Sequence, residues 1–229
     1  RVDKFSKIQT EQSKRLGMWM DWENSYYTNT DENIEGIWYF LKKCSEKGWL
    51  YKSYRVTQYC PRCETTLSQH EMADSYKDVS EDSIYVKFEL NDEPGTFFIS
   101  WTTTPWTMPG HTQLYVKPGE DYVKIQVENE KYIVAEACLG IIKDEYDVLE
   151  KFKAEKLVGK RYDPPFDFLK EAHDQYFKVD VANFVEIEQG TGVVHSAVMY
   201  GAEDYDRAQE QGLKGVHTVD QSGNLNEKT

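Results

Sequence analysis

The sequence changes from strand-like to helix-like within one stretch, Gly95-Thr96-Phe97-Phe98-Ile99-Ser100-Trp101-Thr102-Thr103-Thr104-Pro105-Trp106-Thr107-Met108-Pro109-Gly110-His111. Residues 95–100 are rich in β-branched and aromatic side chains, which predicts a strand. Pro105 suits the first turn of a helix, so we expect Thr104 at the N-cap. Residues 102–104 then place three hydroxyls beside backbone N–H groups that have no helical partner, a corner able to hold a carboxyl, a phosphate or a water. The same hydroxyls could serve only to cap the backbone.

Alternating apolar side chains continue on both sides of this stretch. Ile84, Val86, Phe88 and Leu90 would share one face of a strand. Further strand-like runs lie at residues 113–116, 122–127, 131–134, 177–181 and 192–195, and short helices are expected near 136–142 and 203–211. Many strands separated by turn signals indicate a barrel-like, β-rich structure.

The first third of the chain follows a helical period instead. Apolar residues with helical spacing predict one helix that ends near Gly17 and a second that starts at Thr30 or Asp31 and ends at Gly48. The period becomes alternating near Tyr76. We therefore expect an α+β protein: a helical lead-in over residues 1–76 that carries a Cys-x-x-Cys knuckle, and a β-rich domain over residues 77–229.

Composition limits the possible partners. The 229 residues are enough for a sizeable core, and no run of about 18 apolar residues predicts a membrane span. The formal charge of −13, with the acidic excess after residue 76, disfavours general affinity for nucleic acid. Four cysteines do not make a disulfide framework, so a reducing, cytoplasmic location is expected. The first residue is Arg rather than Met, which indicates a piece of a longer protein.

The knuckle is Cys60-Pro61-Arg62-Cys63. Two thiolates at this spacing are typical of a structural zinc site, which needs four ligands. His70 is a possible third ligand, and Cys138 has no ligand-type neighbour in the sequence. We interpret Cys60 and Cys63 as half of a zinc site, weakly filled or unfilled in this chain; two thiols in a tight turn is the alternative.

Three motifs together carry a family resemblance. They are the Thr-Thr-Thr-Pro-Trp-Thr-x-Pro-Gly run at residues 102–110, the run Gly-Thr-Gly-Val-Val-His-Ser-Ala at 190–197 with Gly-Ala-Glu-Asp-Tyr at 201–205, and Arg-Leu-Gly-Met-Trp-Met-Asp-Trp at 15–22. In this order they resemble the editing (CP1) domain of isoleucyl-tRNA synthetase, over nearly the whole chain.

The resemblance implies hydrolysis of the ester between tRNA(Ile) and a wrong amino acid, chiefly valine. An aminoacyl ester is already activated, so the site must place a water and stabilise developing charge rather than supply a nucleophile. By position, Thr102, Thr103 and Thr104 would be catalytic residues that orient the terminal adenosine or the water. Asp204 would pair with the α-ammonium of the amino acid.

The same resemblance gives three substrate-binding residues. Trp106 would pack beside the terminal nucleotide, and His195 would limit the size of the amino-acid side chain, as in the second sieve of double-sieve editing, for which isoleucyl-tRNA synthetase is a known example. His111 stands where the family usually has Asn, and Val198 where it usually has Pro. An imidazole at 111 could still donate a hydrogen bond.

The implied partners are the 3′ end of mischarged tRNA(Ile) and the remainder of the parent synthetase. Editing would need no cofactor, and ATP would serve only the parent, because the synthetic signatures His-Ile-Gly-His and Lys-Met-Ser-Lys-Ser are absent from this sequence. Two alternatives stay open: a structural or tRNA-binding insert whose editing site has decayed, and a zinc-dependent RNA-binding module without chemistry.

Overall fold

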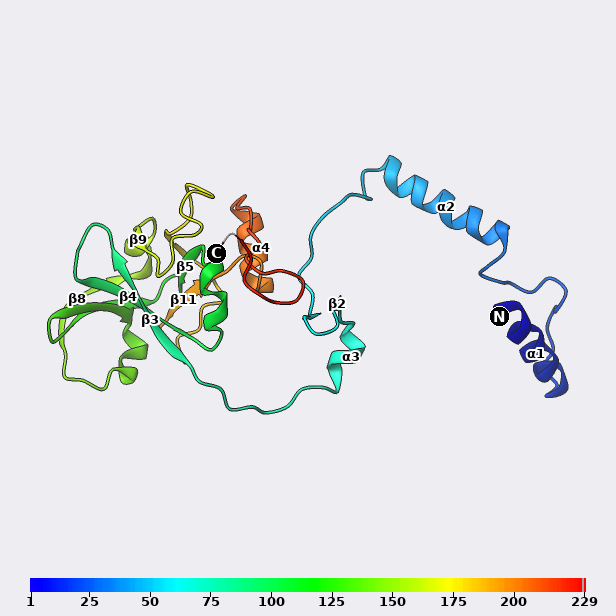
Figure 1. The fold of residues 1–229 in the computed structure, drawn as a ribbon, viewed down its shortest axis with the longest axis horizontal. Helices are drawn as coiled ribbons and strands as arrows, with labels where there is room; N and C mark the ends of the chain where they lie inside the picture. Colours follow the sequence, from blue (N-terminus) through cyan, green and yellow to red (C-terminus); the bar gives the residue numbers. More distant parts are fainter. Residues whose placement is uncertain (228) are drawn as a thin grey trace. The chain divides into compact units, whose positions relative to one another are not determined.

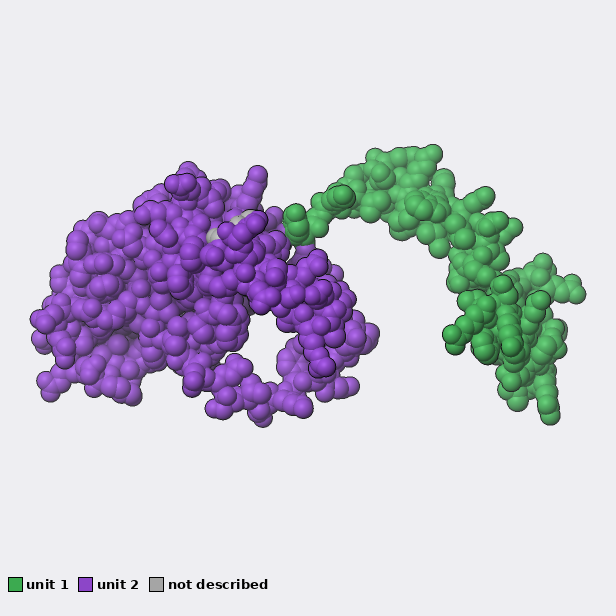
Figure 2. All heavy atoms as spheres, in the orientation of Figure 1, with its two compact units in different colours: residues 1–54 green, residues 55–229 purple. Residues whose placement is uncertain are grey.

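The computed structural model describes residues 1–227 and 229, in two compact units, residues 1–54 and 55–229 (Figures 1 and 2). The Cys-bearing segment therefore groups with the β-rich part rather than with the two helices. The division at residue 76, where the apolar spacing changes, stays a prediction of the domain boundary.

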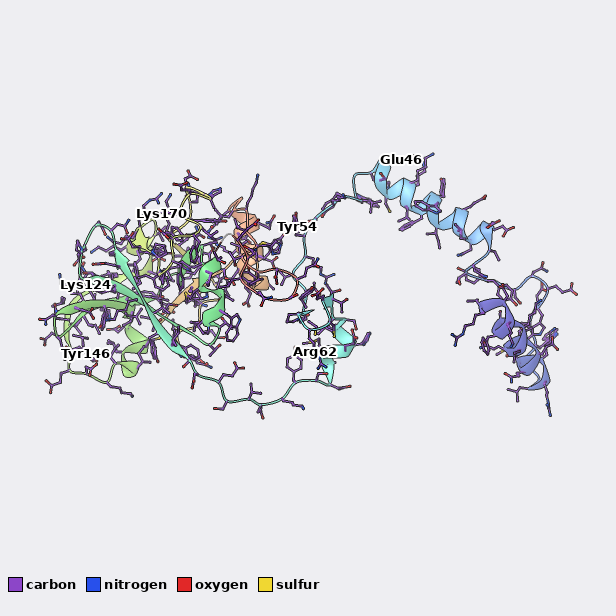
Figure 3. All side chains as sticks on the ribbon, in the orientation of Figure 1. Glu46, Tyr54, Arg62, Lys124, Tyr146 and Lys170 are labelled. Carbon is purple, nitrogen blue, oxygen red and sulfur yellow. The ribbon has the colours of Figure 1, made fainter. Side chains whose placement is uncertain are left out.

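Unit 1 contains α1 (Val2–Arg15) and α2 (Asp31–Glu46). The expected helix signals act as predicted: Gly17 has a left-handed φ of 82°, and the Thr30 hydroxyl accepts the Asn33 N–H at the start of α2. Neither helix has a buried residue, and Trp38 on the apolar stripe of α2 is 65% exposed. Side chains stand apart along both helices and crowd together only in unit 2 (Figure 3).

Unit 2 begins with a small hairpin and a short helix: β1 (Tyr59–Cys60), β2 (Thr65–Thr66) and α3 (Gln69–Ala73). Cys60 pairs with Thr65 across the hairpin. Ser68 and Glu71 form a reciprocal capping box at the start of α3.

The larger sheet of unit 2 has six strands in the order β8-β6-β7-β4-β3-β9. Their bounds in chain order are β3 (Ile84–Leu90), β4 (Thr96–Thr102), β6 (Asp121–Val127), β7 (Glu130–Ala135), β8 (Asp147–Lys153) and β9 (Tyr162–Asp163). Only the β4–β7 pair is parallel among these strands. The predicted alternation holds in β3, where Phe88 and Leu90 are buried and Lys87 is exposed.

The smaller sheet has the order β10-β5-β11 and comprises β5 (Gln113–Val116), β10 (Val179–Val181) and β11 (Val193–Ser196). Three 3₁₀ segments, η1 (Pro105–Gly110), η2 (Glu136–Ile141) and η3 (Ala154–Leu157), and one helix, α4 (Ala202–Glu210), complete the unit. The 3₁₀ turn η2 stands where a short helix was expected.

The α+β class is confirmed, with one difference in the sheets. They are open, with edge strands at both ends, instead of closing into a barrel. The strands β4 and β11 come close, but the link between them is a side-chain bond, in which the His195 N–H donates to Ser100 Oγ at 3.1 Å, and not a strand ladder. This link brings the end of β4 next to β11.

The main hydrophobic cluster of unit 2 contains side chains from both sheets. Phe88 and Phe98 from the larger sheet, Leu114 from the smaller one and Tyr162 from β9 are each at most 1% exposed and share one cluster. Burial of such side chains is the main source of stability. None of the helices in residues 1–227 combines the length and the apolar character that a bilayer span requires.

Candidate active site

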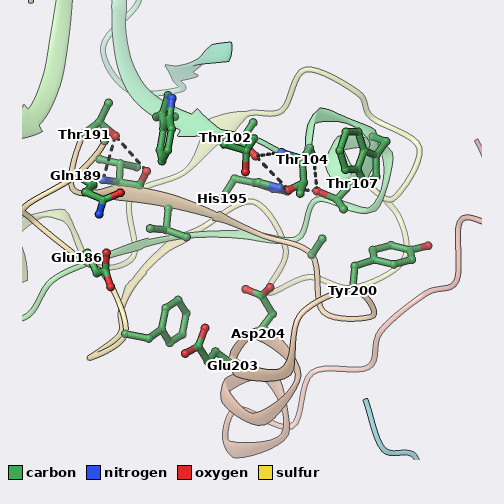
Figure 4. Close-up of a pocket in the computed structure, with 18 of the residues that line it drawn as sticks. Thr102, Thr104, Thr107, Glu186, Gln189, Thr191, His195, Tyr200, Glu203 and Asp204 are labelled. Atoms are coloured by element: carbon green, nitrogen blue, oxygen red, sulfur yellow. Dashed lines mark hydrogen bonds between the residues drawn. The ribbon is translucent and has the colours of Figure 1, made fainter. Parts of the chain in front are cut away.

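A cavity of about 730 Å³ lies in unit 2 beside the end of β4, β11 and the start of α4 (Figure 4). Thr102, Thr104 and His195 lie along one side of it, and Asp204 lies on the other. Thr103 and Trp106 also contribute to the lining. Six of the residues that the sequence singled out therefore line the same cavity. What they bind stays a prediction.

The threonine corner is held by local hydrogen bonds. The Thr104 N–H donates to Thr102 Oγ1 at 3.0 Å, and the two hydroxyl oxygens are 3.3 Å apart. Thr102 is buried, whereas Thr103 and Thr104 are exposed to the cavity side. Thr104 occupies the N-cap position of η1, but its hydroxyl caps no helical N–H. That hydroxyl is therefore able to hold a water or a substrate oxygen.

His195 reaches the cavity from β11. Its Nε2 is 2.8 Å from Thr107 Oγ1, and the Thr107 hydroxyl donates in turn to the Thr104 carbonyl at 2.8 Å. Burial lowers the pKa of His195 to about 4. The imidazole is therefore neutral at physiological pH.

His111 lies behind His195 and is not part of the cavity lining. It is 2% exposed, with Nδ1 3.2 Å from His195 Nδ1 and Nε2 2.7 Å from the Tyr162 hydroxyl. Burial, and then the neighbouring His195, hold its pKa well below the ordinary value of 6.5. The substrate contact predicted for His111 is thus not direct in this structure, because His195 stands between it and the cavity.

Asp204 is the third residue of α4 and is partly buried against the cavity. Burial raises the pKa of its carboxyl to about 6, the neighbouring Ser196 hydroxyl and Ala197 backbone lower it, and the charge of Glu203 raises it. A Cβ atom at Gly201 would lie 2.1 Å from Asp204 Oδ2, so this position needs glycine for the carboxylate to keep its place.

The charge of the lining has one sign. Its ionisable groups besides the histidine and tyrosines are Glu186, Glu203, Asp204 and Asp220, and no Lys or Arg occurs among the lining residues that the structure describes. An interior of this kind favours a cationic group such as an ammonium over a phosphate.

Aromatic residues frame the opening. Trp106 is 62% exposed and free to stack on a planar ligand. Trp101 packs over Gly190, where an added Cβ would meet the ring at 3.2 Å. Tyr200 lines the cavity, and its hydroxyl lies 2.6 Å from Thr218 Oγ1.

Sequence reasoning gave no role to several lining residues, among them Trp101, Thr107 and Tyr200. Trp101 and Thr107 stand inside the quoted stretch but were given no role, and the pairing partner of Thr107, His195, is far away in the sequence. Tyr200 lies between two motif segments and carried no signal of its own.

The two departures from the family pattern are accommodated by the core. Val198 is 1% exposed and belongs to the main core cluster, and both ring nitrogens of His111 have hydrogen-bond partners. His111 therefore has no ring nitrogen without a partner, and Val198 adds an apolar side chain to the core.

Cys60 and Cys63 lie on the β1–β2 hairpin, and their neighbours Tyr59 and Pro61 reach the edge of the cavity. Over the described part of the chain, no three His, Cys, Asp or Glu side chains group as a metal site would require. The pair could supply two of the four ligands of a tetrahedral site, so a zinc ion there would need two ligands from elsewhere. Cys138 is buried and donates to the Ile187 carbonyl.

Comparison with known proteins adds a family to this geometry. Residues 2–204 match the family described as tRNA synthetases class I (I, L, M and V). The chain is 42% identical over 224 residues to an isoleucine–tRNA ligase of Bacillus thuringiensis (strain Al Hakam), covering 97% of this chain and 22% of that protein. It is also 42% identical to the isoleucine–tRNA ligase of Pyrococcus abyssi, over 96% of this chain and 22% of that protein. The chain thus spans about a fifth of the length of these relatives.

Among solved structures, the chain is similar to the one described as GlLeuRS-CP1, with a TM-score of 0.47 and 19% identity over 56% of this chain and 60% of that one. It is also similar to the cytosolic leucyl-tRNA synthetase editing domain of P. knowlesi, with a TM-score of 0.45 and 14% identity over 58% and 64%.

Proposed function

The chain belongs to the tRNA synthetases of class I (I, L, M and V), and on that premise we propose that its cavity hydrolyses the aminoacyl ester of mischarged tRNA(Ile), chiefly Val-tRNA(Ile). The observation that carries the proposal is the position of Asp204 across one cavity from the Thr102–Thr104 corner (Figure 4). An aminoacyl ester offers matching groups, a cationic ammonium next to a carbonyl that a water must attack.

Asp204 binds the α-ammonium in this proposal. With a pKa of about 6, its carboxylate is mostly ionised at pH 7. The lining around it is acidic, which favours a cation. A charge-assisted hydrogen bond in such surroundings is stronger than a neutral one and fixes the ester relative to the opposite wall.

The threonine corner acts on the water and the terminal ribose. The Thr104 hydroxyl is not used for capping, and Thr103 lies beside it on the lining. Hydroxyls both donate and accept, so they can orient a water toward the ester carbonyl without becoming nucleophiles. No covalent intermediate is needed, because the ester is already activated.

Trp106 provides a stacking surface for the terminal adenine, outside the acidic interior. Most of the affinity for tRNA then comes from the remainder of the parent synthetase, which fits a chain with a charge of −13. ATP serves that parent, editing requires no cofactor, and any zinc at Cys60 and Cys63 is structural. The proposed location is the cytoplasm, where aminoacyl-tRNA is made.

The buried positions of His111 and Val198 favour an active site over a decayed one. Val198 packs in the core and both ring nitrogens of His111 have hydrogen-bond partners, which supports a cavity wall that is held in place.

The test is deacylation of Val-tRNA(Ile) and Ile-tRNA(Ile), with the 229-residue chain and with the longer synthetase that contains it. We expect Val-tRNA(Ile) to be hydrolysed faster by at least about tenfold, the lower end of what one methylene supplies in an apolar pocket. Equal rates with the two tRNAs, or no rate above that of buffer in either protein, would refute the proposal. Zinc-dependent tRNA binding without hydrolysis would favour the RNA-binding module instead.

A further inference from the structure

Four side chains form a continuous hydrogen-bonded line from the core to the cavity wall. It runs from the Tyr162 hydroxyl to His111 Nε2 (2.7 Å), from His111 Nδ1 to His195 Nδ1 (3.2 Å), from His195 Nε2 to Thr107 Oγ1 (2.8 Å), and from Thr107 Oγ1 to the carbonyl of Thr104 (2.8 Å). We refer to Tyr162, His111, His195 and Thr107 as the relay.

The last bond gives one complete order for the protons of the relay. The Thr104 carbonyl can only accept; when the single Thr107 hydroxyl proton points at it, Thr107 Oγ1 accepts from His195 Nε2–H. A neutral His195 then has a bare Nδ1, which requires the proton on His111 Nδ1. The bare Nε2 of His111 accepts from the Tyr162 hydroxyl. This assignment follows from the bonding network.

We propose that His111 is a positioning residue: through this relay it fixes His195 in the Nε2–H tautomer with both nitrogens occupied, so that His195 meets the substrate only as a rigid steric wall that limits side-chain size. The proton order stands on the geometry of this chain. Its consequence for side-chain selection rests on the proposed function.

The surroundings of His111 hold the relay in place. Its ring is stacked on Phe177, with ring centroids 6.0 Å apart and an angle of 20°, and lies 4.9 Å from the ring of Phe88. A ring packed on several sides cannot turn freely, so it presents Nδ1 to His195 in one orientation. Burial also keeps both imidazoles neutral, so each ring has one bare nitrogen that can accept a hydrogen bond.

The direct test is the tautomer of each histidine, read from nitrogen NMR shifts of the 229-residue chain labelled at its five histidines. We expect His195 with its proton on Nε2 and His111 with its proton on Nδ1, both neutral from pH 5.5 to 8. Thr107→Val removes the acceptor of His195 Nε2–H and should reverse the order to His195 Nδ1–H, whereas Thr107→Ser should preserve it. An Nδ1–H His195 in the parent chain, or the same tautomer in the Val and Ser variants, would overturn the proposal.

The functional test removes the polar atoms of His111 and Tyr162 while keeping side chains of similar volume. The double change His111→Phe with Tyr162→Phe replaces both partners by apolar rings, so no buried polar group is left alone. We expect the Val-tRNA(Ile) to Ile-tRNA(Ile) preference in kcat/KM to fall about tenfold, in the range that one methylene supplies. Tyr146→Phe, an exposed tyrosine outside the cavity, is the matched control and should keep the preference.

The two arms separate the two proposals. An unchanged preference in the double variant overturns the positioning role of His111, whatever the tautomers are. If the parent chain and the longer synthetase hydrolyse neither tRNA, the proposed function and the selection role fall together, and the NMR result still decides the proton order of the relay.

Discussion

The two walls of the cavity carry ionisable groups that burial shifts in opposite directions. Burial raises the pKa of Asp204 to about 6 and lowers that of His195 to about 4. Both shifts favour the neutral form, yet at pH 7 the carboxylate is charged and the imidazole is not. Burial therefore gives one wall, at Asp204, that changes its charge near neutral pH, and another, at His195, that stays neutral. The outcome depends on the ordinary pKa of each group and on whether its polar atoms already have hydrogen-bond partners.

The largest expected effect comes from removing the negative charge of Asp204. Asp204→Asn should reduce kcat/KM for Val-tRNA(Ile) by about a hundredfold or more. A lost charge-assisted bond is worth roughly 1.5–3 kcal/mol, and misplacement of the ester adds to it. The measurement is deacylation by Asp204→Asn beside the parent chain.

Glu203→Gln is the matched control for this change, because Glu203 lies in the same helical turn and also lines the cavity. It should change kcat/KM less than about threefold, well short of the full loss of a charged bond. If both variants lose activity equally, the loss reflects the total negative charge of the cavity rather than a specific ammonium site at Asp204.

The second effect is a pH profile with a single break. As pH falls below about 6, Asp204 takes up a proton, and kcat/KM for Val-tRNA(Ile) should drop about tenfold per pH unit. His195, with a pKa of about 4, should add no break above pH 5. The profile of Asp204→Asn should lack the break; a break near pH 6 that persists in that variant would assign the titration to another group.

The same shift predicts the sign of a stability change. Because the folded-state pKa of Asp204 is raised, its contribution to stability is fully present below its ordinary value of 3.8 and is lost as pH rises through about 6. At pH 7, Asp204→Asn should therefore be more stable than the parent, by up to about 3 kcal/mol, and the difference should vanish near pH 4. Chemical denaturation at both pH values measures it, and a less stable Asn variant at pH 7 would contradict the raised pKa.

A third change moves the carboxylate without removing it. Gly201→Ala places a methyl 2.1 Å from the present position of Asp204 Oδ2, so the carboxylate must shift. Small displacements of a positioning group can cost up to about a hundredfold in rate, and we expect a loss of at least about tenfold in kcat/KM. Gly140→Ala, which meets no atom within 4 Å, is the control and should leave the rate unchanged. Equal activity in both variants would show that the position of Asp204 is not critical.

Much of the fold could be predicted from local patterns. The limits of α2 and β3 agree with the capping residue Thr30 and with the alternating run, since both elements have their own hydrophobic period. β5 also has the predicted limits, although all four of its residues are buried. β8 was not predicted, because Asp147–Lys153 alternates weakly and forms an exposed edge strand of the sheet. The open sheets could not be predicted, since barrel closure depends on edge pairing that no local pattern encodes.

The residues of one sequence motif could be placed at the cavity from the sequence, whereas contacts between residues far apart in the sequence could not. The Thr102–Thr104 corner and Asp204 lie on the cavity as their motifs indicated. The place of His111 behind His195 was missed, because it follows from the antiparallel pairing of β5 with β11, which sets His195 opposite Leu114. The spacing of residues along the chain does not contain that register.

The smallest effect separates the threonine corner from the carboxylate. Thr104→Ala should slow hydrolysis of Val-tRNA(Ile) about two- to tenfold, since a single neutral hydrogen bond is worth about 0.5–1.5 kcal/mol. The loss is limited because the Thr102 hydroxyl, 3.3 Å away, and Thr103 remain on the same wall to hold the water. Thr104→Ser keeps the hydroxyl and should retain the parent rate, which separates the hydroxyl from the methyl group. The measurement is the deacylation rate of both Thr104 variants beside that of Asp204→Asn, which shows which wall of the cavity contributes more to the rate. If Thr104→Ala slows hydrolysis as much as Asp204→Asn, the hydroxyl and not the ammonium contact is the principal determinant of hydrolysis.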